Sequence, residues 1–162
     1  MHITKKYPNL KIVVNDLYEP LYNFWLHLQC NGEYLHTALK DIKSRYSDRA
    51  SARELFTTAK EKLNDDTTLD QERAVAFYIV NKCSFSGLTE SSSFSEQASD
   101  ANFSMRGIDK LPIYTKLIRN WRITNFSYGT FINELLWFRN RKYFIYLDPP
   151  YDIKDNLYGK KG

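Results

Sequence analysis

Short apolar runs near the two ends of the chain predict β-strands. Leu10–Asp16 (LKIVVND) and Tyr143–Leu147 (YFIYL) are rich in the β-branched and aromatic residues that favour strands, and Arg122–Phe126 is a third short strand. We expect the YFIYL strand to be buried, because it is apolar throughout. Asp148 and then two prolines follow it. Because proline fixes φ and has no amide hydrogen to donate, this strand must end at Asp148.

Apolar residues recur at helical spacing through much of the chain. The pattern predicts helices over Leu17–Gly32, roughly Glu33–Arg45, Ala50–Leu63 and Leu69–Cys83, a stretch from Leu111 to Trp121, and Tyr128–Phe138. Asp16 is placed to cap the first helix and Gly32 to end it. Thr68 or Asp70 can cap the fourth helix. Ser84–Gly107 is serine-rich and has no period, which indicates a long loop that is either functional or disordered.

The order of these elements predicts an α/β fold with a helical insertion. Strands alternate with helices at the two ends of the chain, and helices alone fill its middle. In open α/β sheets, ligands bind at the carboxyl ends of the strands. Asp16 and Asp148 each stand at such an end, so both carboxylates are candidate site residues.

Composition narrows the class of protein. The 162 residues favour one domain, and the net charge of +4 is compatible with a polyanionic partner without requiring one. Cys30 and Cys83 lie far apart without metal-ligand spacing, so we expect reduced thiols and no metal site. No apolar run approaches the length of a membrane span, and the first residues lack a signal-peptide core. These features predict a soluble intracellular protein.

Three segments resemble a known enzyme family. LDPPY (Leu147–Tyr151) resembles the catalytic motif of amino-group DNA methyltransferases, which has the form Asp/Asn/Ser-Pro-Pro-Tyr/Phe. AFYIVNKCSFSGL (Ala76–Leu88) is similar to that family's helix ending in Asn, followed by an aromatic loop and Gly-Leu. VVNDL (Val13–Leu17) is similar to the strand whose acidic residue meets the cofactor ribose. The segments occur in the order found in Dam-like, site-specific adenine-N6 methyltransferases.

The resemblance implies a fold, a cofactor and a substrate. The fold would be a partial S-adenosylmethionine-dependent methyltransferase sheet of Rossmann-like type, with a helical target-recognition insertion. Residues 1–30 and 109–162 would form the partial catalytic domain, and residues 31–108 the insertion. The methyl donor would be S-adenosylmethionine and the substrate double-stranded DNA. Such enzymes act in restriction–modification, which implies the cytoplasm of a bacterium or of a phage-infected host cell.

The resemblance also assigns roles to individual residues. Asp16 would bind the cofactor ribose. The catalytic residues would be Asp148, Pro149, Pro150 and Tyr151. The DNA-contacting residues would be Asn81, Lys82, Phe85, Ser86, Leu88 and Arg106, within or just before the serine-rich region.

The chemistry of adenine explains why this motif holds these residue types. The exocyclic amine is a poor nucleophile because its lone pair is delocalised into the ring. The Asp148 carboxylate and the Pro149 carbonyl can both accept hydrogen bonds from that amine, and the two prolines hold these acceptors at a fixed separation. A base inside a duplex is out of reach, so it must be flipped out, and the Tyr151 ring can stack on it.

Simpler interpretations stay open for each segment. Asp-Pro-Pro-Tyr can be a turn that ends a strand, and Asp16 a helix cap that serves with or without a ribose. Asn81 can be a polar helix end and Phe85 a loop anchor. A second hypothesis for function is a non-catalytic nucleic-acid-binding or assembly module. A third is methylation of RNA or of protein glutamine amides, which the Phe85–Leu88 loop disfavours.

The resemblance leads us to expect a fragment. The family pattern places a strand and a Gly-rich cofactor loop before the Val13 strand, yet all six glycines lie after Asp16. Further strands follow the catalytic loop in the family. The missing first strand would lie between the strands that end at Asp16 and Asp148. Its absence would leave open edges, which we expect to pair with a second copy or with a partner chain that supplies the segment. Direct pairing of Leu10–Val14 with Tyr143–Leu147 is the alternative.

The first prediction concerns the 162-residue chain by itself. It should transfer no methyl groups, because the Gly-rich cradle for the methionine part of the cofactor is not among its residues, and it should be a dimer or larger species in solution. Incorporation of labelled methyl groups into adenine checks the first statement, and light scattering checks the second. Activity of the purified chain, or a monomer, would contradict the corresponding half.

Overall fold

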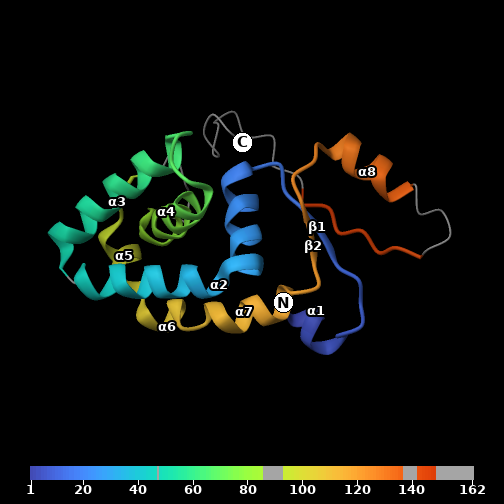
Figure 1. Cartoon of the computed structure of the whole chain (residues 1–162), viewed down its shortest axis with the longest axis horizontal. Coiled ribbons are helices and arrows are strands. Elements are labelled where there is room, and N and C mark those ends of the chain that lie inside the picture. The colour runs from blue at the N-terminus through green and yellow to red at the C-terminus, as the bar shows by residue number, and fades with distance from the viewer. Residues whose placement is uncertain (47, 86–92, 137–141, 149–162) are drawn as a thin grey trace.

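A computed structural model describes residues 1–46, 48–85, 93–136 and 142–148 of the chain. Figure 1 shows a body of helices on one side and a pair of strands on the other. The elements are α1 (His2–Lys6), β1 (Val13–Asn15), α2 (Glu19–Arg45), α3 (Arg49–Asn64), α4 (Asp70–Cys83), α5 (Glu96–Asn102), α6 (Met105–Ile108), α7 (Leu111–Ile118), β2 (Arg122–Thr124) and α8 (Tyr128–Leu136).

The two strands pair in parallel, which agrees with an α/β fold. Val13 lies opposite Arg122, and Asn15 lies opposite Thr124. Both strands were expected, and both are shorter than their apolar runs. Parallel pairing places the carboxyl ends of β1 and β2 at the same end of the sheet. The residues that follow Asn15 and Thr124 therefore meet there.

The prediction of a buried strand over Tyr143–Leu147 is wrong for the described residues. No strand is assigned in residues 142–148, and the exposed fraction rises to 92% at Phe144. The alternative pairing with Leu10–Val14 is not found either, because β1 pairs with β2 in the two-stranded sheet. A strand needs a neighbouring backbone as well as strand-forming side chains, and here β2 is the neighbour of β1.

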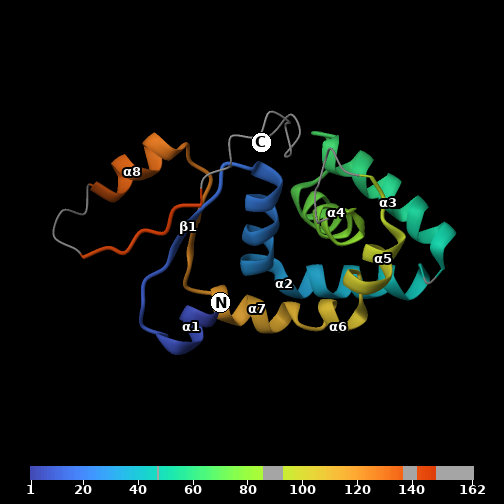
Figure 2. The ribbon, with the colours of Figure 1, turned by 180° about the vertical axis from the view of Figure 1, so that it is seen from behind.

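Helix α4 is the centre of the helical body. Every residue from Arg73 to Val80 is buried, as is Cys83, so this helix is enclosed on all sides rather than on one stripe. Seen along its axis in Figures 1 and 2, it lies between α2 and α3, with α5 close by. Residues of the core cluster that it joins include Phe24, Leu28, Leu35, Leu39, Leu55, Phe56, Leu63, Phe103, Ile108, Leu111 and Ile118.

The buried Arg73, paired with two partly exposed carboxylates, fixes the start of α4 against the start of α2. The Arg73 guanidinium lies 2.6 Å from the Glu19 carboxylate and 3.4 Å from that of Asp70. Asn23 adds a hydrogen bond of 2.8 Å from its side-chain amide to the Asp70 carbonyl oxygen. Breaking such a pair leaves a charge buried without a partner, so these contacts hold the two helix ends in one arrangement.

The predicted helix end at Gly32 coincides within one residue with a break in α2, although Glu19–Arg45 is assigned as one element. The backbone is non-helical at Asn31 (φ −138°, ψ 39°), where two predicted helices join into one bent helix. A Cβ on Gly32 would overlap the hydroxyl of Thr115 in α7. The same hydroxyl donates a 2.9 Å hydrogen bond to the Leu28 carbonyl oxygen, just before the bend. Glycine is needed here because two helices approach closely.

Two further local predictions, on the cap of α4 and on the serine-rich region, are corrected by the structure. Neither Thr68 nor Asp70 caps α4, whose N-cap residue is Leu69 without a side-chain bond. The Ser84–Gly107 region also contains more structure than a loop, since α5 and α6 lie within it. Ser95 Oγ accepts from the Ala98 amide and Ser104 Oγ from the Gly107 amide, each at 3.2 Å. Some of the serines in this region are therefore the N-cap residues of helices.

A matched pair of glycine substitutions tests the close approach of α2 and α7. Gly32→Ala should destabilise the chain by about 1–2 kcal/mol, because the added methyl group overpacks a tight helix contact. Gly129→Ala in α8 meets nothing within 4 Å and should be neutral or slightly stabilising. Denaturant unfolding of both variants measures the difference. Equal stability of the two would contradict the close-packing role of Gly32.

Candidate functional site

The carboxyl end of the β1–β2 pair is fixed by the side chain of Asn15. Its Oδ1 accepts hydrogen bonds from the Phe126 amide at 2.8 Å and the Thr124 hydroxyl at 3.0 Å. Its Nδ2 donates to the Phe126 carbonyl oxygen at 2.9 Å. One side chain thus satisfies both backbone groups of a residue more than a hundred positions away, and it holds the two chain segments together where they leave the strands.

Asn125 makes the reciprocal contact from the other strand end. Its Nδ2 donates to the carbonyl oxygens of Asp16, at 2.7 Å, and Leu17, at 2.9 Å. The backbone that carries the Asp16 carboxylate is therefore held from outside its own segment. Sequence reasoning missed both asparagines. The available signal was an amide residue directly after the apolar residues in VVN and shortly after them in ITN.

The Asp16 side chain lies in the turn between β1 and α2. Its Oδ1 accepts a 2.9 Å hydrogen bond from the Tyr18 amide. Tyr18 is itself the N-cap residue of α2, so Asp16 bonds the cap residue and does not cap the helix directly as predicted. Desolvation by the surrounding protein raises the pKa of Asp16, and the hydrogen bond from Tyr18 opposes that rise. The carboxylate can accept further hydrogen bonds, as a ribose recognition site requires.

The predicted catalytic motif lies only in part within the described residues. Asp148 is exposed at the end of the extended segment 142–148. Pro149, Pro150 and Tyr151 lie outside the described residues. The placement of these four residues relative to Asp16 therefore stays a prediction.

Three of the predicted DNA-contacting residues gather at the end of α4. Asn81 and Lys82 occupy its last turn, and the Lys82 ammonium lies over the Tyr78 ring, 5.7 Å from the centroid. Phe85 follows the helix with an exposed fraction of 66%. Its amide donates a 3.3 Å hydrogen bond to the Ser93 carbonyl oxygen. Ser86 and Leu88 lie outside the described residues.

Arg106 comes from a different element, α6, and is exposed. The next residue, Gly107, packs close to the Tyr78 hydroxyl, since a Cβ there would lie 3.3 Å from it. Burial raises the pKa of Tyr78 to about 12, so this hydroxyl stays neutral. Because the Lys82 ammonium lies over the Tyr78 ring, this buried tyrosine contacts both α6 and the last turn of α4.

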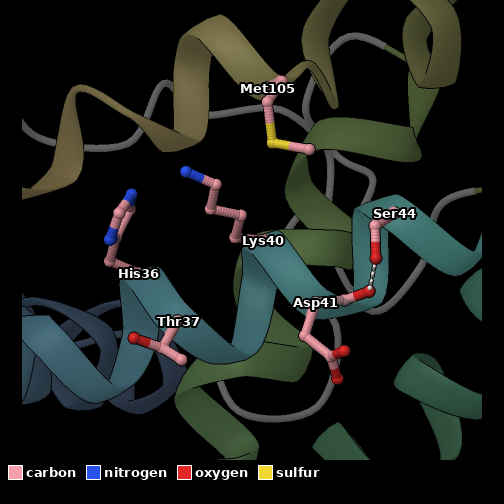
Figure 3. Close-up of a pocket in the computed structure, with 6 residues that line it drawn as sticks. All are labelled: His36, Thr37, Lys40, Asp41, Ser44 and Met105. Atoms are coloured by element: carbon pink, nitrogen blue, oxygen red, sulfur yellow. Dashed lines mark hydrogen bonds between the residues drawn. The ribbon is translucent and has the colours of Figure 1, made fainter.

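A shallow groove between α2 and α6 is part of the packing of these helices against each other. It measures about 400 Å³ and is lined by His36, Thr37, Lys40, Asp41, Ser44 and Met105. In Figure 3 the His36 and Lys40 side chains point towards α6, while Asp41 points away. The His36 ring nitrogen and the Lys40 ammonium lie 3.2 Å and 3.6 Å from the Asp109 carboxylate. The hydrogen bond with His36, and secondarily Lys40, lowers the pKa of Asp109. The contacts of His36 and Lys40 with Asp109 join α2 to the turn between α6 and α7.

Metal and membrane sites are not found in the part of the chain that the structure describes. No group of three or more His, Cys, Asp or Glu residues is placed there to hold a metal ion. None of the described helices combines the length and the apolar character needed to cross a membrane. Both cysteines are free thiols, and burial raises the pKa of Cys83, which disfavours its reactive thiolate form.

Comparison with protein families gives a match over almost the whole chain. The family model of the D12 class N6 adenine-specific DNA methyltransferases matches residues 1–161. The chain belongs to this family. A comparison with curated proteins finds no match. Membership in the D12 class supports methyl transfer to adenine in DNA as the family activity. The matched residues include both strand ends and the helices between them.

The raised pKa of Asp16 makes a prediction about stability. A carboxyl with a raised pKa in the folded state binds its proton more tightly when folded. The contribution of Asp16 to stability therefore falls as the pH rises above 3.8, the ordinary pKa of an aspartate side chain. Asp16→Asn cannot ionise and keeps an oxygen to accept from Tyr18. We expect the variant to be at least as stable as the wild type at neutral pH and to lose that relative advantage at about pH 3.

Thermal unfolding of both proteins across this pH range provides the measurement. If the wild type gained stability over the variant as pH rose from acid to neutral, the Asp16 carboxylate would be stabilised by folding, contrary to the prediction.

Proposed function

We propose that this chain carries the catalytic and target-recognition residues of a Dam-like, S-adenosylmethionine-dependent DNA adenine-N6 methyltransferase. The observation that carries the proposal is the D12-class match over residues 1–161. Two features of the chain support the finer assignment. Asp16 follows a parallel strand at its carboxyl end, and the Asp-Pro-Pro-Tyr motif ends in an aromatic residue suited to a flipped base.

The residues around Asp16 fit the ribose of the cofactor. A carboxylate just beyond a parallel strand, in the turn before a helix, is the acceptor that pairs with ribose hydroxyls in dinucleotide-type sheets. Here Asn125 holds the backbone of that carboxylate in place. S-adenosylmethionine would supply an electrophilic methyl group. Asp16 would bind its ribose and orient it at the end of the sheet.

Asp148 and Pro149 would act on the target amine. Their oxygens would accept hydrogen bonds from the two N6 hydrogens, which favours a tetrahedral nitrogen whose lone pair is available. Transfer would form the N6–carbon bond as the sulfur–methyl bond of the donor breaks, with the bonding pair going to the sulfur of the departing thioether, and the surplus N6 proton would leave to solvent. Pro150 would keep the turn rigid, and Tyr151 would stack on the extruded adenine. No covalent link to the protein is required.

DNA would be contacted from the helical insertion, residues 31–108. Asn81, Lys82 and Phe85 lie together at the end of α4. Ser86, Leu88 and Arg106 complete the proposed contact set. Lys82 offers a cation for phosphate and Phe85 an exposed ring for stacking or groove insertion.

Within the described residues the sheet has two strands, which supports the expectation of a second chain. Parallel sheets are normally covered on both faces, and a sheet of two strands is marginal by itself. Apolar residues are exposed at β1 itself and just after it, with Val13 at 38% and Leu17 at 59%, and also in the segment 142–148, with Leu147 at 56%. A homodimer, or a partner chain that adds a strand, would bury such residues. It would also provide a backbone to which residues 142–148 can hydrogen-bond.

Substitution of Asp148 tests the catalytic assignment. In whichever assembly of this chain transfers methyl groups, Asp148→Ala should abolish transfer and leave DNA binding within about tenfold, because it removes a contact made in the transition state. Asp148→Asn keeps an acceptor oxygen and should retain more activity than Asp148→Ala. Single-turnover methylation and a DNA-binding titration separate the two effects. Near-normal turnover by Asp148→Ala would refute the assignment.

Substitution of Tyr151 gives a second, independent readout. Tyr151→Ala should weaken binding of the flipped base by about 1–3 kcal/mol, and Tyr151→Trp should do so less. A fluorescent base analogue at the target position reports flipping. If Tyr151→Trp were the worse variant, stacking would be the wrong explanation. Tight binding of S-adenosylmethionine in calorimetry would exclude the alternative of a non-catalytic nucleic-acid-binding module.

A further inference from the structure

A second polar and aromatic groove runs along the outer face of α3. It measures about 650 Å³ and is lined by Arg53, Phe56, Thr57, Lys60, Glu61, Asn64, Ser93 and Phe94. Six of these residues come from α3, and the last two come from the segment just before α5. The groove is therefore outside the sheet-end site and outside the groove between α2 and α6.

Two cations and two rings form a continuous row in this groove. The Arg53 guanidinium lies over the Phe94 ring, 5.1 Å from its centroid. The Phe94 and Phe56 rings contact each other with centroids 5.7 Å apart. The Lys60 ammonium lies over the Phe56 ring at 6.0 Å. Phe56 is buried, so the row is anchored in the core.

The charge of Arg53 is positioned without being neutralised. Within the part of the chain that the structure describes, no carboxylate lies at ion-pair distance from it, whereas Arg45, Arg73 and Arg122 each pair with a carboxylate. An aromatic ring orients a guanidinium and leaves its donors and its charge available. Glu61 lines the same groove and offsets part of its positive charge.

The groove continues into the segment already assigned to DNA. Phe94 forms an antiparallel bridge with Ser84, and the Phe85 amide bonds the Ser93 carbonyl oxygen. The backbone that presents Phe85 is thus paired with the backbone that supplies the Phe94 ring. A ligand that contacts Phe85 would have the α3 groove as its neighbouring surface.

We propose that the α3 groove binds the sugar-phosphate backbone of duplex DNA beside the target site. This inference rests on the proposed function. Arg53 would donate to a phosphate, since arginine is suited to phosphate geometry. Asn64 lines the same face and has a second amide hydrogen beside the one that it donates to the Lys60 carbonyl oxygen. The Thr57 hydroxyl already donates to the Arg53 carbonyl oxygen at 3.1 Å. Arg53 and Lys60 are seven positions apart, which at 1.5 Å per residue is about 10 Å, the length of roughly three base steps.

The test measures how DNA affinity depends on salt. Fluorescence anisotropy of the full chain with a labelled duplex of about 30 base pairs gives the dissociation constant at several salt concentrations. Arg53→Ala should weaken binding about three- to tenfold near physiological salt. It should also reduce the slope of log affinity against log salt by about 0.9, the value for one lost phosphate contact. Arg53→Lys should recover part of the slope.

Lys62→Ala is the matched control. Lys62 lies on the same helix, but its ammonium pairs with the Glu72 carboxylate at 3.1 Å and it does not line the groove. Its removal changes the net charge by the same amount and should leave the slope within error. Thermal unfolding should show that Arg53→Ala is folded, because Arg53 is exposed. Arg53→Gln, which keeps the length of the side chain, should lose the same slope.

Distinct outcomes overturn the inference. If the wild type binds the duplex but Arg53→Ala and Lys62→Ala give equal slopes, the α3 groove is not a phosphate site, and the proposed function stands. If Arg53→Ala affects only single-stranded DNA, the duplex assignment is wrong. If the wild type shows no salt-dependent binding to duplex DNA, the inference fails together with the DNA role in the proposed function.

Discussion

The parallel pairing of β1 with β2 is the constraint on which the arrangement depends. It joins residues more than a hundred positions apart, as in the bond from the Thr124 hydroxyl to the Val14 carbonyl oxygen. A parallel connection must return to the starting edge, so the intervening chain has to leave the sheet and come back. The helices from α2 to α7 make that excursion. Asn15 and Asn125 then fix the point of return, and the Asp16 carboxylate lies at that point.

The bend at Asn31 and the contact at Gly32 make the excursion compact. Figure 1 shows the second half of α2 running beside α6 and α7, so the outgoing and returning segments lie side by side. Thr115 bonds the Leu28 carbonyl oxygen before the bend, and Gln29 bonds the carbonyl oxygens of Ile118 and Trp121 at the end of α7. The sheet and the helical body are thereby coupled through one helix–helix contact.

The sequence pattern predicted the elements whose own residues carry the signal. It did not predict contacts between residues that are far apart along the chain. The helices over α3 and α4 and the strands β1 and β2 followed from periodicity and strand propensity, because each carries its own signal. The helix break near Gly32 followed from the sequence, but the contact of Gly32 with Thr115 did not, because Thr115 is far along the chain. Serines that looked like a loop include the caps Ser95 and Ser104, which are recognised only beside the helices that they start. The position of Asp16 at the end of a strand was predicted from the sequence, whereas the contacts of Asn15 and Asn125 depend on a pairing that sequence alone does not reveal.

The same distinction separates the two halves of the proposed site. The Asp16 half is preorganised, because hydrogen bonds from a second segment hold its backbone. The Asp148 carboxylate follows an extended segment whose residues Phe144, Tyr146 and Leu147 are largely exposed, and no strand is assigned there. Acceptors act on a transition state only when they are held in place before the reaction. A strand added beside residues 142–148 would bury these side chains and fix Asp148 at once, so in the proposed enzyme assembly and catalytic competence would be a single event.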